Sequence, residues 1–219
     1  MRVAELITLL REKRINTWFD LGLFIDSVKE EAYNYSRSSA GKSQQSPLRQ
    51  PSVLQSSTYD GFKKKLGKSG VGFVTFHYSV DGVTVEIQKY AKALQGLMPG
   101  VPIHFIAGNF LPEAERFIDK SIVRHTIKEL SGFDNWKLYD AFFNLKMERG
   151  SDAYNKLIRL FWEDTCNIVE KLGSYIEKKN IKLLYLVNVC SNPGNVSMAL
   201  ACTLLSEYLR IPVLNNNHD

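Results

Sequence analysis

The chain has 219 residues, of which 44% are hydrophobic and 23% are charged, with 28 Lys and Arg residues against 23 Asp and Glu residues. This composition excludes a wholly disordered chain, and no apolar run approaches the roughly 18–20 residues of a membrane helix, so we expect no stable membrane insertion. The net charge of +5 is modest and forms no dense basic stripe, so the sequence predicts no nucleic-acid partner.

The cysteine and histidine positions argue against bridged or metal-bound sites. Cys166, Cys190 and Cys202 form no CxxC pair, and the four histidines are scattered. We therefore predict no disulfide framework, no metal site and no cofactor. Residues 1–10 show no secretory signal pattern, and the expected location is cytoplasmic.

Two segments precede the main apolar pattern. Residues 1–33 carry apolar side chains at helical spacing and predict a helical N-terminal extension of one or two short helices. Residues 34–70 are rich in Ser, Gln and Lys and contain few large apolar residues. Ordering such a segment loses more entropy than burial recovers, so we predict a disordered linker there.

Residues 71–219 alternate between strand and helix patterns. The predicted strands are Val71–His77, Pro102–Ala107, Leu183–Val189 and Ile211–Asn215. The predicted helices are Val83–Leu94, with Tyr90 on the buried face, then Glu113–Leu130, Asn135–Met147, a long helix capped by Ser151 and Asp152, and Val196–Leu209. Continuous apolar strands are typical of a parallel sheet that is covered on both faces. The fold class is therefore α/β, a Rossmann-like parallel sheet with helices on both faces.

Ligands of such sheets bind beyond the carboxyl ends of the strands, which places the candidate site at four strand exits. The first exit, Asp81-Gly82-Val83, opens a helix, and free backbone N–H groups there favour a phosphate. Later exits carry hydrogen-bonding side chains that suit sugar hydroxyls: Asn109, Ser191, Asn192, Asn217 and His218. Asn195 is expected to cap the following helix. His77 and His104 lie within strands and are interpreted as core residues, with His77 also a second-rank site candidate.

Several of these segments together resemble a known family. The stretch Phe76–Ile87, followed by Ala91-Lys92-Ala93-Leu94, is similar to the opening strand–turn–helix of family 4 glycosyltransferases of the GT-B fold. Ile103–Asn109 resembles their second strand. Leu186–Leu209, Ile211-Pro212-Val213 and His218-Asp219 resemble a later strand, helix and small-Pro-Val…His-Asp run.

The resemblance implies that residues 71–219 are the N-terminal, acceptor-side domain of a retaining enzyme that transfers a sugar from a nucleotide-diphosphate donor to a sugar or sugar-phosphate acceptor. His218 and Asp219 would lie beside the reacting sugar as catalytic residues. Asp81, Gly82 and Val83 would contact the donor diphosphate, although the family carries Gly-Gly where this chain has Asp81-Gly82. An anionic Asp81 would repel a diphosphate unless it turns toward the acceptor hydroxyls.

The family's second domain, which holds the nucleotide-sugar donor, has no counterpart in the sequence, so we expect this chain alone to be inactive. The alternative function is a non-catalytic Rossmann-like binding or interaction domain. A third interpretation, another Rossmann-like enzyme such as a methyltransferase, requires an acidic residue at the end of the second strand. Gly108-Asn109 supplies none.

Overall fold

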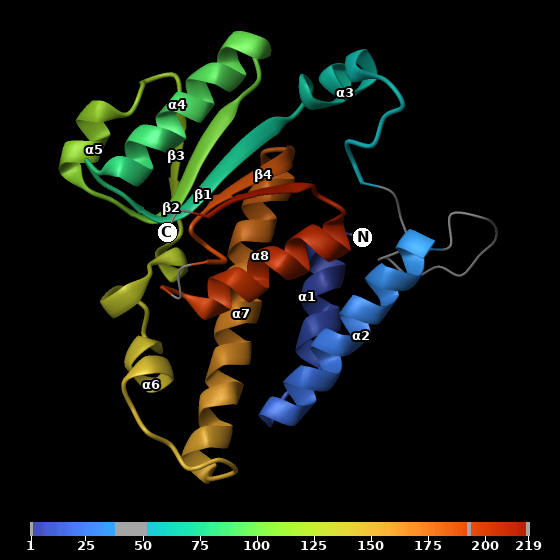
Figure 1. Ribbon diagram of the computed structural model, residues 1–219, viewed down its shortest axis with the longest axis vertical. Coiled ribbons are helices and arrows are strands. Elements are labelled where there is room, and N and C mark those ends of the chain that lie inside the picture. The colour runs from blue at the N-terminus through green and yellow to red at the C-terminus, as the bar shows by residue number, and fades with distance from the viewer. Residues whose placement is uncertain (1, 38–51, 192–193, 218–219) are drawn as a thin grey trace.

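The protein is a three-layer α/β structure built on an all-parallel five-stranded sheet with strand order β3-β2-β1-β4-β5. The computed structural model describes residues 2–37, 52–191 and 194–217, and the side chains of residues 31–37 are not among those described. Helices lie on both faces of the sheet, as Figure 1 shows. The predicted Rossmann-like fold class is confirmed.

The helices and strands follow one another in the order that a doubly wound sheet requires. In chain order they are α1 (Val3–Glu12), α2 (Trp18–Arg37), α3 (Tyr59–Leu66), β1 (Gly70–Tyr78), α4 (Gly82–Leu97), β2 (Ile103–Phe110), α5 (Pro112–Phe117), β3 (Val123–Thr126), the short 3₁₀ helices η2 (Lys128–Leu130) and η3 (Phe133–Asn135), α6 (Tyr139–Phe143), α7 (Asp152–Lys178), β4 (Ile181–Val187), α8 (Val196–Leu209) and β5 (Val213–Asn216).

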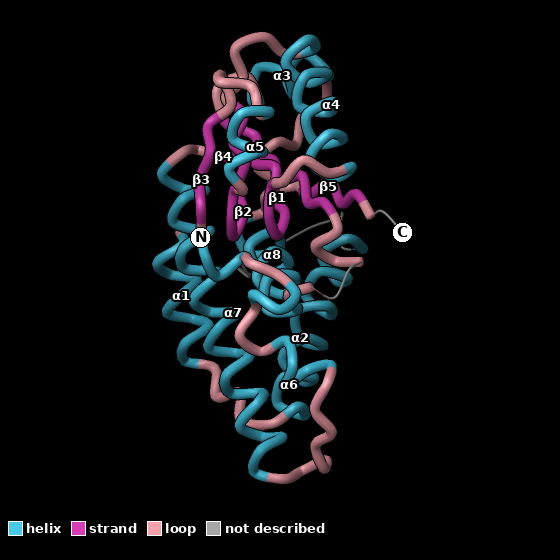
Figure 2. The backbone as a smooth tube through the Cα atoms, turned by 90° about the vertical axis from the view of Figure 1, so that its left-hand side faces the viewer, coloured by secondary structure: helices cyan, strands magenta, loops and turns pink. Residues whose placement is uncertain are grey.

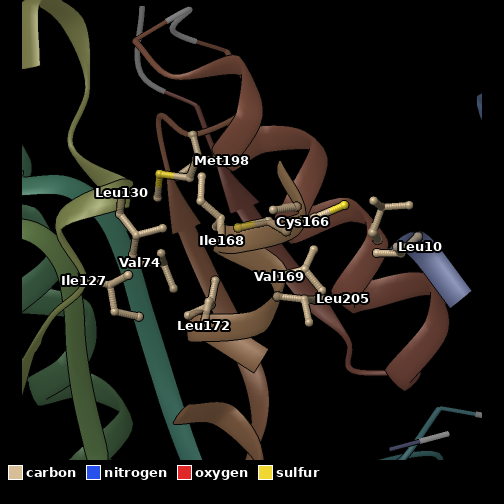
Figure 3. Close-up of a cluster of buried hydrophobic side chains, with 14 of the residues drawn as sticks. Leu10, Val74, Ile127, Leu130, Cys166, Ile168, Val169, Leu172, Met198 and Leu205 are labelled. Atoms are coloured by element: carbon tan, nitrogen blue, oxygen red, sulfur yellow. The ribbon is translucent and has the colours of Figure 1, made fainter. Parts of the chain in front are cut away.

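One apolar core lies between the sheet and the layer formed by α1, α2, α7 and α8. It joins Val74 of β1 to Leu172 of α7 and Leu205 of α8, and it includes Leu10 of α1. Figure 3 shows these side chains converging on one another. The N-terminal helices are therefore part of the same core as the sheet, since Leu6 and Leu10 are fully buried.

A second core lies on the opposite face of the sheet, beneath α3, α4 and α5. Phe73 and Phe105 of the two central strands pack there against Ile87 and Ala91 of α4. The central strand β1 is buried along Gly70–Phe76, which explains its uninterrupted apolar sequence.

The long helix α7 confirms the helical pattern read from the sequence. Ser151 caps it, because its Oγ accepts a hydrogen bond from the backbone N–H of Tyr154 at 3.2 Å. The apolar stripe from Leu157 to Ile176 faces the core. The helix has 27 residues, and Figure 2 shows that α7 extends well past the strands together with α1 and α2.

The structure corrects the prediction of a helix over Glu113–Leu130. The α-helix there is limited to Pro112–Phe117, Val123–Thr126 forms the edge strand β3, and Lys128–Leu130 is the short 3₁₀ helix η2. This strand is short and partly exposed, so it lacks the apolar run that identified the other strands. The helix predicted over Asn135–Met147 is limited to Tyr139–Phe143.

Two further differences concern the first half of the chain. The predicted linker 34–70 contains the helix α3, which Thr58 caps by accepting from the N–H of Gly61, and which Leu66 anchors in the second core. Residues 38–51 of that segment lie outside the described residues. Tyr90 was predicted on the buried face of α4 but is 41% exposed, with its ring 5.3 Å from that of Tyr185.

Candidate functional site

The carboxyl ends of β1 and β2 border a cleft of about 500 Å³, which we call the sheet-edge cleft. His77 and Asn109 are paired in register on neighbouring strands, and both are exposed. The loop that follows β3 forms the opposite wall. The lining residues are Phe76, His77, Gly108, Asn109, Leu111, Lys128, Ser131, Gly132 and Asn135.

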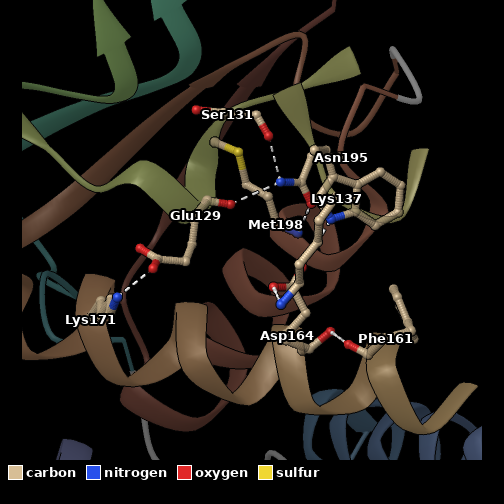
Figure 4. Close-up of polar contacts among 10 residues, drawn as sticks. Glu129, Ser131, Lys137, Phe161, Asp164, Lys171, Asn195 and Met198 are labelled. Carbon is tan, nitrogen blue, oxygen red and sulfur yellow. Dashed lines mark hydrogen bonds and ion pairs between the residues drawn. The ribbon is translucent and has the colours of Figure 1, made fainter. Parts of the chain in front are cut away.

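The wall that follows β3 is held in place by Asn195, which lies more than sixty residues away in sequence. The side-chain amide of Asn195 donates hydrogen bonds to the backbone oxygens of Glu129 at 2.9 Å and Ser131 at 2.8 Å. Its side-chain oxygen accepts from the N–H of Met198 at 2.9 Å, which confirms its predicted role as the cap of α8. Figure 4 shows these contacts between the loop and the start of α8.

Two glycines allow this wall to approach the strands closely. A Cβ atom at Gly108 would lie 2.2 Å from the backbone nitrogen of Ser131, and a Cβ atom at Gly132 would lie 2.7 Å from the ring of Phe76. Neither separation is possible between non-bonded atoms. The close approach of this wall to β1 and β2 therefore requires that Gly108 and Gly132 have no side chain.

Asp81 is committed to the cap of α4. Its Oδ1 accepts a hydrogen bond from the N–H of Thr84 at 2.7 Å, and its Oδ2 accepts from the hydroxyl of Ser79. The N–H of Ser79 in turn donates to Oγ1 of Thr84 at 3.1 Å. The carboxylate therefore occupies the position at the helix N-terminus where the sequence predicted a phosphate.

The electrostatics of this turn follow from these contacts. Burial raises the pKa of Asp81, but the hydrogen bonds from Ser79 and Thr84 and the nearby His77 outweigh it, so the pKa lies below its ordinary value. Oδ2 of Asp81 is 3.7 Å from Nε2 of His77. The negative charge of Asp81 is thus held at the edge of the cleft, beside an imidazole that can offer a hydrogen bond.

The predicted site residues are distributed along one edge of the sheet and do not form one cluster. Of those described, Asn109 lines the sheet-edge cleft, and Asp81, Gly82 and Val83 lie at the adjoining start of α4. Ser191 follows β4 and Asn217 follows β5, both exposed and on the other side of β1 in the strand order. Asn192, His218 and Asp219 lie outside the described residues.

The two strand histidines have opposite environments. His104 is a core residue, as predicted: it is 4% exposed, and its Nδ1 is 2.9 Å from the hydroxyl of Tyr175. His77 was interpreted mainly as a core residue, which is wrong, because its side chain is 44% exposed at the cleft. His77 is the one exposed residue of β1, since Tyr78, which follows it, is fully buried.

Three polar cleft residues were missed by sequence reasoning: Lys128, Ser131 and Asn135. The sequence predicted helices on both sides of residue 131, which hid the loop. The run Ser131-Gly132-Phe133-Asp134-Asn135 is rich in turn-forming residues and could have indicated it.

The described residues contain no group of three or more His, Cys, Asp or Glu side chains arranged to hold a metal ion. None of the helices in the described ranges combines the length and the apolar character that crossing a bilayer requires.

Comparison of the chain with protein families, with curated proteins and with solved structures gives no match. The likeness to family 4 glycosyltransferases therefore stays a prediction from the sequence.

Proposed function

We propose that the protein is the acceptor-side domain of a retaining sugar transferase and that the sheet-edge cleft holds the acceptor, a sugar or sugar phosphate. The observation that supports this best is the polar lining of the cleft at the carboxyl ends of β1 and β2. His77, Asn109 and Asn135 offer both donors and acceptors, which sugar hydroxyls require. Lys128 adds a cation that suits a phosphate on the acceptor.

The proposal assigns the remaining roles according to the family resemblance. His218 and Asp219 would lie beside the reacting sugar, and Ser191, Asn192 and Asn217 would contribute hydrogen bonds along the same edge. The nucleotide diphosphate of the donor would be held mainly by a second domain, as in that family. Because Asp81 already fills the N-terminus of α4, the described residues should bind a nucleotide weakly.

The test is a titration of the ¹⁵N-labelled full chain with a hexose, a hexose phosphate and a nucleoside diphosphate, followed by NMR. We expect shifts at the amides of His77, Asn109 and Ser131, with the hexose phosphate binding tightest and the nucleoside diphosphate weakest. Tighter binding of the nucleoside diphosphate, or shifts that cluster away from the cleft, would contradict the proposal.

Two variants assign the contacts. Lys128→Gln should weaken hexose-phosphate binding by about tenfold while leaving the hexose nearly unchanged, since it removes one charge-assisted hydrogen bond. Asn109→Ala should weaken both ligands to a similar extent. Lys120→Gln is the matched control, because Lys120 is an exposed lysine outside the cleft. A non-catalytic binding domain would reproduce these affinities, and a transfer assay on a chain that carries the donor domain separates the two functions.

A further inference from the structure

A second cleft lies on the helical layer, between the α1–α2 connection and α7. It has a volume of about 660 Å³, and we call it the basic cleft. Its walls carry four cations, which come from the end of α1, the α1–α2 connection and α7, and its floor is apolar. The residues that define it here are Arg11, Lys13, Arg14, Arg159, Trp162 and Cys166.

The cations of the basic cleft outnumber the carboxylates that could neutralise them. Arg11 is paired with Glu170, with Nη2 and Oε2 2.5 Å apart. Within the part of the chain that the structure describes, Lys13, Arg14 and Arg159 form no ion pair, and Glu163 is the one carboxylate residue in the lining. Like charges that converge on one hollow repel one another unless an anion lies between them.

The floor of the basic cleft is rigid and apolar. Trp162 is 7% exposed and packs edge-on against Phe24, with ring centroids 5.2 Å apart. Burial raises the pKa of the Cys166 thiol to about 11, so the thiol is neutral at physiological pH and contributes apolar surface. Lys13 is positioned with its Nζ 6.0 Å from the centre of the Phe24 ring. The cations therefore border a preformed hollow that has an apolar floor.

We propose that the basic cleft binds a ligand that carries phosphate groups. The planar guanidinium groups of Arg14 and Arg159 can each offer two N–H donors to a phosphate, and the two residues belong to separate parts of the chain, the α1–α2 connection and α7. A volume of this size holds a small molecule or a headgroup. The lining shares no residue with the sheet-edge cleft, so this binding is independent of the acceptor site.

The test uses inorganic tripolyphosphate and the full chain, with tryptophan fluorescence as the readout because Trp162 lines the cleft. Arg14→Gln with Arg159→Gln should weaken binding at least about tenfold, since two charge-assisted contacts are removed. Both arginines are exposed and without ion pairs among the described residues, so the double variant should fold. The control Lys92→Gln with Arg116→Gln makes the same change in net charge on the other face of the sheet, from α4 and α5.

A second arm distinguishes a free phosphate ligand from a lipid headgroup. Vesicles of phosphatidylcholine, with and without phosphatidic acid, are sedimented with the wild-type chain and with both double variants. If the wild-type chain and the control variant co-sediment with the vesicles that contain phosphatidic acid, and Arg14→Gln/Arg159→Gln does not, the ligand is a lipid headgroup. Binding of tripolyphosphate without vesicle binding would identify a soluble ligand.

Two outcomes would overturn the proposal. If the two double variants bind tripolyphosphate with equal affinity, the anion is attracted by the net charge of the protein and not by the basic cleft. No fluorescence change up to about 1 mM tripolyphosphate, a concentration that reveals even weak binding, would show that the cleft holds no phosphate. Lys128→Gln, in the sheet-edge cleft, should leave the tripolyphosphate titration unchanged, which separates this proposal from the acceptor site.

Discussion

At the carboxyl ends of the strands, His77 and Asn109 are exposed and line a cleft, whereas toward the amino ends His104 is buried against Tyr175. Both histidines belong to neighbouring central strands of the same sheet. What lies over each side chain decides the difference, because Tyr175 of α7 covers His104, whereas His77 faces the sheet-edge cleft. A polar residue in a strand is therefore structural or available to a ligand according to what packs over its side chain, since Tyr78, the residue after His77, is fully buried.

The largest expected effect comes from replacing Gly108 by Ala at the carboxyl edge. The new Cβ atom would lie 2.2 Å from the backbone nitrogen of Ser131 and 2.4 Å from its Cα, so the loop must move. Overpacking of this kind costs about 3 kcal/mol of unfolding free energy. Urea denaturation measures it, and hexose-phosphate binding should fall in parallel because the wall of the cleft is displaced.

Gly96→Ala is the control for this substitution. Gly96 lies in α4, and a Cβ atom there meets nothing within 4 Å. The same chemical change should stabilise the protein by up to about 1 kcal/mol, because Ala favours the helix. If both variants lose similar stability, the close approach of Ser131 to β2 is not what requires a glycine at position 108.

The next effect concerns the folding stability of the protein at acid pH, which depends on the buried His104 and the half-buried His125. Burial lowers the pKa of His104, and the positive charges of Lys179 and His125 lower it further. Burial also lowers the pKa of His125, together with the charges of Lys179 and Lys178. The ring of His125 stacks on that of Tyr175, with centroids 3.6 Å apart. The unfolded chain then binds protons more readily than the folded chain. Stability should be complete above about pH 6.5, the ordinary histidine pKa, and should decline as the pH falls below it.

His125→Phe tests this pH dependence. Phenylalanine keeps an aromatic ring against Tyr175 but cannot be protonated, so the variant should lose less stability than the wild type between about pH 7 and pH 5. Denaturation at the two pH values measures the difference. An unchanged pH dependence would mean that His125 is as easily protonated in the folded chain as in the unfolded one.

The parts of the fold that were predicted correctly are those that a local pattern specifies. Continuous apolar runs identified β1, β2 and β4, and the 3.6-residue period identified α4 and α7. The edge strand β3 has no such pattern: Val123, Arg124, His125 and Thr126 are all partly or fully exposed. It is a strand because its backbone pairs with β2, and this pairing leaves no signature in four residues.

The candidate site was predictable to the same extent. Asn109 was identified because it directly follows an apolar strand. Lys128 and Ser131 reach the sheet-edge cleft in a loop that Asn195 helps to hold, through contacts with backbone oxygens 66 and 64 residues away in sequence. A contact between residues so far apart in the sequence cannot be predicted from a short stretch of sequence. Asp81 illustrates the reverse case, since one position could serve either as a ligand contact or as a helix cap, and the structure shows the cap.

The smallest expected effects come from Asp81 itself. Asp81→Ala removes the hydrogen bond to the N–H of Thr84 and should cost about 1 kcal/mol of unfolding free energy, while Asp81→Asn keeps an acceptor and should cost less. Loss of the charge beside His77 should also raise the affinity for a hexose phosphate by about threefold and leave an uncharged hexose unaffected. Asp152→Asn, at the start of α7, is the matched control and should change neither affinity. Equal gains for the charged and uncharged ligands would show that Asp81 acts through the shape of the cleft and not through its charge.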